Sequence, residues 1–345
     1  MPIVGEGRLK AAVSEVLKAY GAAEDEVPLV AESLVRAEMR GTDTHGLPYL
    51  KVLIERIDAR MVEVPTRVTI LRQDRATGLL DGGNGIGQVA GWKAMELSVL
   101  KAREFGIGLT LVRNTNNIGF LAFYTLWVAG QGLVGMAMAN ANAAISPWGG
   151  AEAFFGTNPV SIAVPGREEP LALDMSSSLV ARGRIRKAHR LGQKIPLGWA
   201  FDEFGAPTED PRAALKGVLA PIGGPKGYGL ALMVDILAGM LSGAAFGPAV
   251  KSFHQLTGPT RVGALMLAID VERFMPLAQF RTLLTGYTES IRGSRKAKGT
   301  SRIYLPGEIE SEKEKTSRMQ GIQLSDASVE MLNQLLEKAN SSLRL

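Results

Sequence analysis

Short apolar segments alternate with segments of helical periodicity through the middle of the chain, and this alternation constrains the fold most. Strands are expected at residues 68–71, 78–80, 107–112, 133–139, 160–164, 171–173 and 262–269. Helices are expected at residues 88–105, 120–129 and 227–241. Such alternation is typical of an α/β fold, in which helices pack on a sheet. Because several of the strands are apolar throughout, we expect a sheet that is covered on both faces.

The two ends of the chain have a different character. Apolar residues recur at helical spacing over residues 7–20, 26–39 and 47–59, which predicts a small helical region at residues 1–65. Residues 66–290 then form the α/β domain. The last segment, residues 291–345, is polar, contains the charged run 310–315 and ends in a predicted helix at 327–339.

The composition excludes several kinds of site. The chain of 345 residues has no cysteine, so it has no disulfide, thiolate nucleophile or cysteine metal ligand. Its three histidines lie far apart, and we expect no metal site. The net charge of +5 does not require a nucleic-acid partner. No apolar run could span a membrane and no signal-peptide core is present, so we expect a cytoplasmic protein.

Two glycine-rich loops resemble nucleotide-binding motifs without matching them. Residues 82–87 (GGNGIG) are followed by Gln88, where the dinucleotide fingerprint requires glycine, and we interpret them as a turn. Residues 223–229 (GGPKGYG) lack the Ser or Thr that follows the lysine of a P-loop. Lys226 at the start of an apolar helix suits an anion such as a pyrophosphate, although a plain tight turn explains the loop equally well.

Side-chain amides gather between residues 113 and 178. They belong to Asn114, Asn116, Asn117, Asn140, Asn142 and Asn158. Amides at strand ends can bind a ligand or can hold turns, and their number here favours a ligand crevice at the edge of a sheet. Asp174 follows an apolar strand and is a candidate for ribose hydroxyls or for a helix N-cap.

His45 lies in the stretch 39–49 (MRGTDTHGLPY), between two predicted helices. The near-neutral pKa of a histidine suits proton transfer. The same stretch fits a helix N-cap in which Thr42, Asp43 or Thr44 begins the next helix and His45 has no role. We expect His189, in a basic stretch, and His254 to be without function.

Eight motifs follow one another along the chain in an order that identifies a family. They are DTHG (43–46), RNTNNIG (113–119), PWGG (147–150), FGTNP (155–159), LDMSSS (173–178), IPLGWAFDEFGAPTEDP (195–211), GGPKGYGLAL (223–232) and YLPGE (304–308). This set resembles the malate/L-lactate dehydrogenase family of type 2 over nearly the whole chain. The resemblance implies a homodimeric oxidoreductase that uses NAD or NADP on a non-Rossmann cofactor domain, residues 66–290. It also implies that residues 291–345 return to the N-terminal region to complete a helical domain.

The resemblance further implies roles for individual residues. His45 faces the substrate as proton donor or acceptor, with Thr44 beside it. The cofactor contacts lie within the segment 170–176, at the start of an apolar helix and in a C-terminal turn. These residues are Asp174, Met175, Ser176, Lys226, Gly227, Pro306, Gly307 and Glu308. For NADP, the 2′-phosphate would need cations such as Arg182, Arg184 and Arg186.

The chain departs from the family at two positions. Asn117 replaces a second histidine, and an amide can hold the reacting oxygen but cannot act as a general base. Tyr49 replaces an arginine that would grip a substrate carboxylate. We expect hydride exchange between nicotinamide and a small 2-hydroxy or 2-keto acid, with Asn117 holding the oxygen and Thr44 and Tyr49 orienting the substrate. The alternatives are a reductase of a cyclic imine carboxylate and a relative that binds nucleotide without activity.

Overall fold

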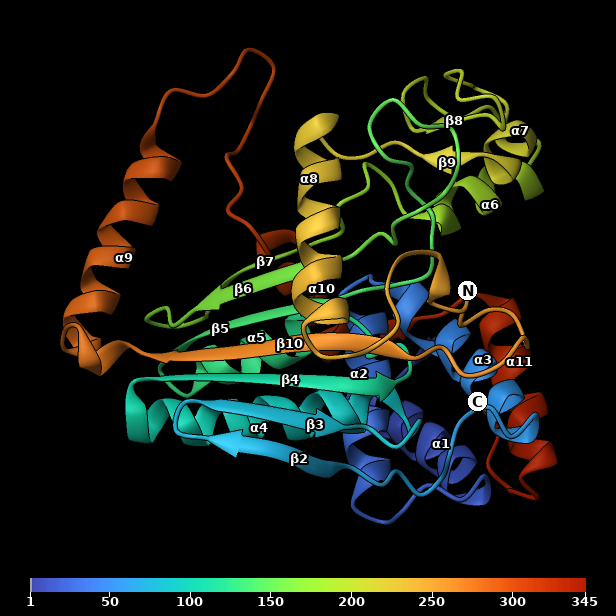
Figure 1. The fold of residues 1–345 in the computed structure, drawn as a ribbon, viewed down its shortest axis with the longest axis horizontal. Helices are drawn as coiled ribbons and strands as arrows, with labels where there is room; N and C mark the ends of the chain where they lie inside the picture. Colours follow the sequence, from blue (N-terminus) through green and yellow to red (C-terminus); the bar gives the residue numbers. More distant parts are fainter. Residues whose placement is uncertain (1) are drawn as a thin grey trace.

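The computed structural model describes residues 2–345, apart from the side chain of Asp43, and is centred on a mixed sheet (Figure 1). Its seven strands lie in the order β2-β3-β4-β10-β5-β6-β7. They are β2 (Thr69–Asp74), β3 (Thr77–Asp81), β4 (Ile107–Thr115), β5 (Leu133–Ala139), β6 (Val160–Val164), β7 (Leu171–Met175) and β10 (Val262–Asp270). Only the β3–β4 pair is parallel. Every strand expected from the apolar runs is present, and the α/β class is confirmed.

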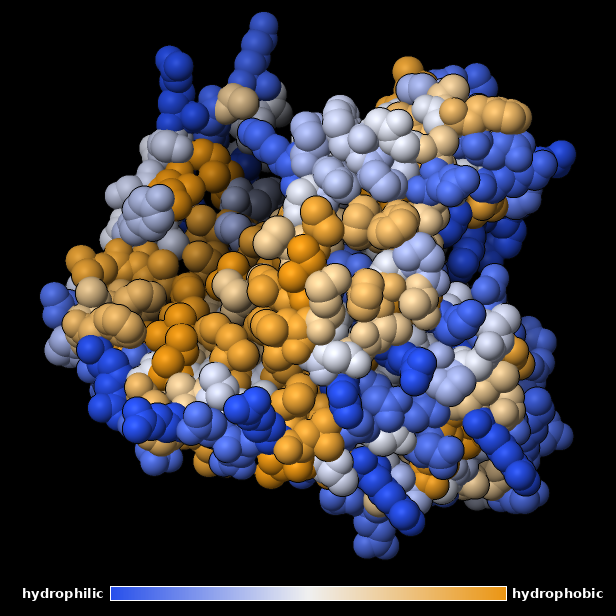
Figure 2. Space-filling view, in the orientation of Figure 1, coloured by the Kyte–Doolittle hydropathy of each residue, from blue (hydrophilic) through white to orange (hydrophobic). Residues whose placement is uncertain are grey.

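The two faces of the sheet are covered unequally. Helices α4 (Gly87–Phe105) and α5 (Ala122–Gly130) pack on one face and enclose an apolar core. On the other face, α8 (Pro225–Val234) and the π-helix η2 (Asp235–Met240) cover only part of the strands. Leu173 at the sheet edge is 38% exposed, and Figure 2 shows a broad apolar surface on this side. The expectation of a sheet covered on both faces is therefore wrong for the single chain.

Helices from both ends of the chain pack together beside the sheet. They are α1 (Glu6–Ala19), α2 (Glu26–Met39), α3 (Leu47–Asp58), α10 (Glu308–Gln320) and α11 (Asp326–Lys338). The apolar sides of α1, α2, α3 and α11 form one core, as their spacing predicts. The short strands β1 (Ile3–Val4) and β11 (Ile322–Gln323) pair next to it, and both termini lie there (Figure 1).

Two further parts project from the sheet. The α6 lobe, residues 179–220, contains α6 (Arg182–Arg190), α7 (Pro211–Lys216) and the paired strands β8 (Ala200–Phe201) and β9 (Val218–Leu219). Helix α9 (Leu277–Gly293) stands apart and has no buried residue. Short 3-10 turns complete the chain at η1 (Asp43–His45), η3 (Gly247–Ala249) and η4 (Val271–Arg273). No helix in the described chain has the length and apolar character needed to cross a membrane.

The helix expected at residues 227–241 begins earlier and changes form. It starts at Pro225, a favoured first position because proline lacks an N–H group, and becomes a π-helix at Asp235. The buried carboxylate of Asp235 accepts hydrogen bonds from Asn140 Nδ2 at 3.1 Å and from the Gly247 N–H at 2.7 Å. The wider helix thus coincides with a buried polar anchor that the sequence pattern does not reveal.

Candidate active site

The turn that carries His45 connects α2 to α3. Thr44 Oγ1 lies 3.1 Å from His45 Nδ1, Thr44 is exposed and His45 is half-buried. The N-cap of α3 is Gly46, and Glu38 Oε1 accepts the N–H of Leu47 at 2.6 Å. A Cβ atom at Gly46 would lie 2.2 Å from this oxygen, so the turn needs a glycine. The expectation that Thr42 or Thr44 is the N-cap is wrong, because Glu38 takes the helix donor; the Asp43 side chain lies outside the described atoms.

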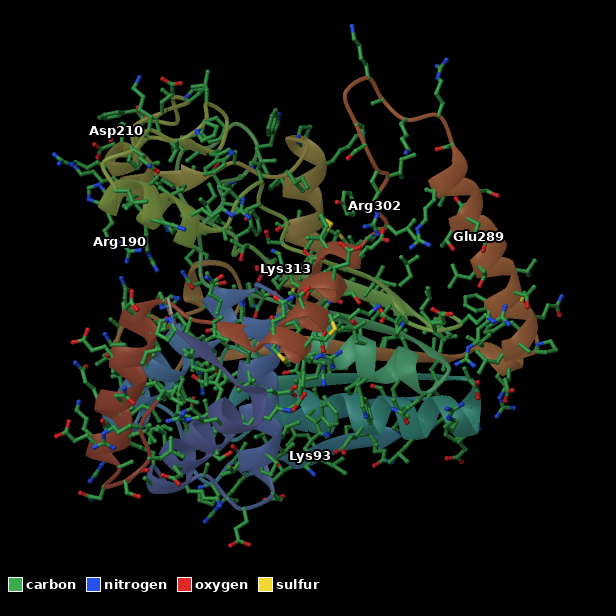
Figure 3. The ribbon with its side chains drawn as sticks, turned by 180° about the vertical axis from the view of Figure 1, so that it is seen from behind. Lys93, Arg190, Asp210, Glu289, Arg302 and Lys313 are labelled. Carbon is green, nitrogen blue, oxygen red and sulfur yellow. The ribbon has the colours of Figure 1, made fainter. Side chains whose placement is uncertain are left out.

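A buried ion cluster fixes the start of this turn. Glu314 on α10 accepts from Arg40 Nη1 at 2.6 Å, from Arg36 Nε at 3.0 Å and from Arg318 Nη2 at 3.0 Å. Burial opposes ionisation, but the three arginines hold the pKa of Glu314 below its ordinary value. Figure 3 shows Lys313 on the same helix. Helix α10, from the C-terminal part of the chain, is therefore bound to Arg40 at the end of α2.

Tyr49, on α3, is a buried residue that contacts the loop carrying Asn117. Its ring stacks on Phe253 with centroids 4.7 Å apart, and its hydroxyl donates to the Asn117 carbonyl at 2.7 Å. Burial raises the pKa of Tyr49 well above its ordinary value, so the hydroxyl stays protonated. Only 3% of the residue is exposed. The expected direct contact with substrate does not fit this buried position, and Tyr49 instead holds the loop that carries Asn117.

Gln88 belongs to the same buried arrangement and was not expected at the site. Its Oε1 atom lies 3.0 Å from the Tyr49 hydroxyl, while its Nε2 atom and Ser33 Oγ have no partner among the described atoms. A phenol has one proton, and Tyr49 gives it to Asn117. Turning the Gln88 amide round lets Nε2 donate to the Tyr49 oxygen and removes the buried unpaired donor. Gln88, Tyr49 and Asn117 then form one directed chain of hydrogen bonds.

The Asn117 side chain presents a donor. Its Oδ1 atom accepts the Gly119 N–H at 2.9 Å, which fixes the orientation of the amide. The Nδ2 group has no acceptor among the described residues, and the residue is half-buried. Four other asparagines brace the protein instead: Asn114 donates to Asp81, Asn116 to Gly85, Asn140 to Asp235 and Asn158 to Ala231. Asn142 makes only a long contact of 3.5 Å with a neighbouring carbonyl.

The residues expected at the cofactor come from three segments that adjoin. The Ile222 N–H, just before the 223–227 loop, donates to Ser177 O at 2.9 Å. A Cβ atom at Gly307 would lie 2.4 Å from Ala172 O on β7, so the 306–308 turn packs against this strand. Lys226 is exposed in the first turn of α8, where backbone N–H groups attract anions. Gly227 is required for packing, because its Cβ atom would meet Ile222 O at 2.2 Å.

Asp174 lies at the end of β7 against the N-terminus of α5. Its Oδ2 atom accepts the Ala122 N–H at 2.8 Å. The residue as a whole is solvent-accessible, although protein atoms enclose much of its carboxylate. This partial burial raises the pKa of Asp174 to about 6, against the opposing effects of the Ala122 hydrogen bond and the charge of Arg40.

The remaining cofactor candidates differ in how far their polar groups are engaged. Glu308 accepts the Leu305 N–H at 2.8 Å and pairs with Arg292 at 3.0 Å and with Arg302. Burial opposes ionisation of Glu308, but these contacts hold its pKa below the ordinary value. Ser176 Oγ lies 3.1 Å from Ser178 O; Met175 is half-buried and Pro306 is exposed. Arginines therefore occupy the Glu308 carboxylate, whereas Met175, Ser176 and Pro306 remain accessible.

His254 and α6 border the site. No role was expected for His254 from the sequence, and the α6 arginines were considered only for a cofactor 2′-phosphate. A Cβ atom at Gly183 would lie 3.2 Å from the Thr44 methyl group, so α6 touches the His45 turn. His254 follows Phe253, with ring centroids 6.1 Å apart. Partial burial and the charges of Arg186 and Arg56 lower the pKa of His254. An aromatic pair in a polar loop was the only signal in the sequence.

Comparison with known proteins identifies relatives over the whole chain. The family model described as malate/L-lactate dehydrogenase matches residues 4–333. Malate dehydrogenase of Pyrococcus horikoshii is 34% identical, covering 97% of this chain and 95% of the relative. L-sulfolactate dehydrogenase of Methanocaldococcus jannaschii is 36% identical over 96% and 94%. The crystal structure of malate dehydrogenase from Entamoeba histolytica matches with a TM-score of 0.95 and 32% identity, covering 100% of this chain and 99% of that one.

Other similar proteins are named for different substrates and cofactors. Ureidoglycolate dehydrogenase (NAD(+)) of Escherichia coli is 31% identical over 89% of this chain and 88% of its own. (2R)-3-sulfolactate dehydrogenase (NADP(+)) of Chromohalobacter salexigens is 36% identical over 75% and 78%. The structure of delta1-piperideine-2-carboxylate reductase of Pseudomonas syringae matches with a TM-score of 0.86 and 26% identity, over 97% of this chain and 100% of that one.

Proposed function

The chain belongs to the malate/L-lactate dehydrogenase family and is an NAD- or NADP-dependent oxidoreductase of small 2-hydroxy acids, and we propose how its residues carry out the reaction. The observation that carries the proposal is the Asn117 amide. Its oxygen is held by the Gly119 N–H, so its Nδ2 donor is left for a ligand near His45. A donor beside a proton-transfer group is what a carbonyl needs in order to become an alcohol.

In this proposal the protein positions the substrate and handles one proton. The bound nicotinamide supplies the hydride in reduction and accepts it in oxidation. Asn117 Nδ2 donates a hydrogen bond to the reacting oxygen, which gains negative charge as the carbonyl is reduced. His45 gives that oxygen a proton in reduction and removes it in oxidation. Thr44 Oγ1 contacts His45 Nδ1, and this contact helps to orient the imidazole ring.

The cofactor is proposed to lie where three segments meet. Lys226 and the N-terminus of α8 suit its phosphates, and Asp174 suits ribose hydroxyls. Met175, Ser176 and Gly227 would line this place, and the turn Pro306, Gly307 and Glu308 would close it. Support comes from the contacts of Ser177 with Ile222 and of Gly307 with Ala172.

The substitution Asn117→Asp tests the proposed role of the amide. Aspartate keeps an oxygen for the Gly119 N–H but replaces the donor with an acceptor. We expect kcat/KM for the best 2-hydroxy acid to fall about a hundredfold, with cofactor affinity unchanged. Asn333→Asp is the matched control, because Asn333 Oδ1 also accepts a backbone N–H, from Leu345 at 2.9 Å. Unchanged turnover in Asn117→Asp would remove Asn117 from the reaction.

Two alternatives keep the same fold. A reductase of cyclic imine carboxylates is supported by the similarity to the piperideine-2-carboxylate reductase. A protein that binds nucleotide without turnover is supported by the loss of a second histidine at Asn117. Assays with 2-hydroxy acids, 2-keto acids, ureidoglycolate and cyclic imines, beside a cofactor titration, separate these cases. Cofactor binding without turnover of any compound would favour the second alternative.

We also propose that the molecule is a homodimer. Helix α9 has no buried residue, and Leu283 and Tyr287 on it are 57% and 68% exposed. The partly open face of the sheet adds a broad apolar surface (Figure 2). A second copy would cover such a surface, which is unusual on a monomer. Sedimentation of Leu283→Glu should give a monomer and that of Glu289→Gln, on the same helix, a dimer; a monomeric wild type would contradict the proposal.

Finer features of the organisation remain part of the proposal. Residues 1–65 and 291–345 are proposed to form one helical domain, supported by the pairing of β1 with β11 and of Arg40 with Glu314. Residues 66–290 are proposed as a non-Rossmann cofactor domain, because a Rossmann sheet is mostly parallel and this one has a single parallel pair. Limited proteolysis tests the domain boundaries, and cell fractionation tests the proposed cytoplasmic location.

A further inference from the structure

One face of α6 is basic and borders the turn that carries His45. Residues three and four apart share a helix face, so Gly183, Arg186, Lys187 and Arg190 lie together. Ile185 points the opposite way and is buried in the core of the α6 lobe. Gly183 contacts Thr44, which brings this face to the site. In Figure 3 the Arg190 side chain extends from the helix toward the helical part of the molecule.

The cations on this face are exposed and have no acidic partner within the described part of the chain. The ion pair of the same lobe, Lys194–Glu209, lies on the segment after α6. Arg182 is different, because it donates to Leu215 O at 3.1 Å and to Gly217 O at 3.0 Å and so holds α6 to α7. Like charges held close together repel, and an anion bound among them removes this repulsion. The cations on this face of α6 are therefore available to bind an anionic ligand.

His254 approaches the same place from another part of the chain. Its neighbour Phe253 stacks on Tyr49, and Tyr49 binds the carbonyl of Asn117. His254 is next to Phe253 in the chain, with ring centroids 6.1 Å apart, so it lies beside the Tyr49–Phe253 pair. Partial burial and, to a smaller extent, the charge of Arg186 lower the pKa of His254, which agrees with a position on the α6 side of the site. The site is thus bordered by His45 and Asn117 on one side and by Arg186 and His254 on the other.

We propose that Arg186 and His254 bind a second acidic group of the substrate, remote from the reacting carbon. Arg186 lies three residues beyond Gly183, about 4.5 Å further along the helix, so it is displaced from the point where α6 meets Thr44. Tyr49 is buried and occupies the position at which the family has an arginine clamp. In this proposal the cation for the second acidic group is Arg186 on α6. This inference rests on the proposed function, because it assumes a 2-hydroxy acid between His45 and Asn117.

Malate and lactate provide the test, because they share the reacting carbon and differ in the second carboxylate. Each acid is titrated calorimetrically, as both enantiomers, into protein saturated with NADH, which cannot react with a hydroxy acid. In Arg186→Gln, malate affinity should fall about tenfold to a hundredfold, as for a lost charged hydrogen bond. Lactate affinity should stay within about twofold of the wild type. Arg212→Gln, an exposed arginine on α7, is the matched control and should leave both affinities unchanged.

Each other outcome has a definite meaning. Equal losses for malate and lactate, or no loss for either, would overturn the proposal. A loss of NADPH affinity in Arg186→Gln, with NADH and malate binding unchanged, would assign this cation to the cofactor 2′-phosphate and would also overturn it. Turnover of 2-hydroxy acids by the wild type is measured separately. If turnover is present but Arg186→Gln binds malate normally, the function stands and the inference fails.

Discussion

The two sides of the candidate active site differ in how their polar groups are satisfied. On the side of His45, the Tyr49 hydroxyl, the Asn117 side-chain oxygen and the Glu314 carboxylate form hydrogen bonds within the protein, and Tyr49 and Glu314 are buried. Beyond Thr44, Arg186 and Arg190 on α6 are exposed and have no acidic partner in the described chain. The first side can hold a proton-transfer group in place, because its geometry is fixed before a ligand arrives. The second side keeps charge free for a ligand.

The largest difference is expected between two histidines, one from each side. In His45→Ala, kcat should fall about a hundredfold to ten-thousandfold, because the proposed proton donor is lost. His189→Ala, on exposed α6, should change kcat less than about twofold. Steady-state assays with the best substrate measure both. Near-normal turnover by His45→Ala would contradict the proposed role of His45 in proton transfer.

The next effect concerns stability and contrasts a buried carboxylate with an exposed one. Glu314→Gln leaves Arg36 and Arg40 without their counter-charge and should lower the free energy of unfolding by about 3 kcal/mol. Glu209→Gln removes the exposed partner of Lys194 and should cost less than about 1 kcal/mol. Urea unfolding at neutral pH compares the two. Similar losses of unfolding free energy in both variants would show that the Glu314 cluster does not stabilise the fold more than an exposed ion pair does.

The pH dependence of Glu314 sharpens the same contrast. Its pKa is lowered in the folded state from the ordinary 4.5, so the native state holds the charged form more strongly than the unfolded chain does. The stability that it contributes is therefore complete above pH 4.5 and is lost as the pH falls below that value. The difference in unfolding free energy between wild type and Glu314→Gln should shrink on acidification, whereas a constant difference would contradict this origin.

A smaller effect is expected from one hydroxyl group. Tyr49→Phe keeps the ring on Phe253 but leaves the Asn117 carbonyl without its donor. We expect kcat to fall about tenfold and the free energy of unfolding to fall by about 1 kcal/mol. Tyr20→Phe, at the C-cap of α1, is the control for loss of a phenol hydroxyl and should change neither. If Tyr49→Phe shifted KM alone, the hydroxyl would bind substrate and not position the loop.

The smallest effect is expected at Asp174, at the end of β7 beside the proposed cofactor segments. Burial raises its pKa to about 6 from 3.8, so the protonated form suits the folded protein. Its contribution to stability is complete below pH 3.8 and is lost as the pH rises through about 6. Asp174→Asn should therefore gain thermal stability relative to wild type between pH 5 and pH 7, as melting curves would show. Asp326→Asn, an exposed carboxylate on α11, controls for charge; a pH-independent difference at Asp174 would contradict the shift.

Elements with a regular apolar pattern were predictable from the sequence. The strands at 107–112, 133–139, 160–164 and 262–269 lie inside β4, β5, β6 and β10. Four helices were not expected: the six-residue α7 is short, and α6, α9 and α10 lack the usual apolar stripe facing a core. Only Ile185 of α6 and Glu314 of α10 are buried, and α9 has no buried residue. Charge, and not apolar burial, holds α10 in place.

The site was predictable only in part, because hydrogen bonds between distant residues leave no local pattern. His45 and Asn117 were expected from motifs, and the structure brings their surroundings together through Tyr49. The asparagine-rich segments gave a misleading signal, because most of their amides brace the backbone. Gln88 and His254 carried no motif, since their proximity depends on helix packing and on a loop from elsewhere in the chain.

The bond between Arg40 and Glu314 joins residues that are 274 positions apart. During synthesis the ribosome releases the His45 turn early, while α10 is made near the end. Arg40, just before this turn, therefore gains its carboxylate partner only after almost the whole polypeptide has been made. An unfinished chain that ends before α10 would carry the His45 turn without the carboxylate that binds Arg36 and Arg40.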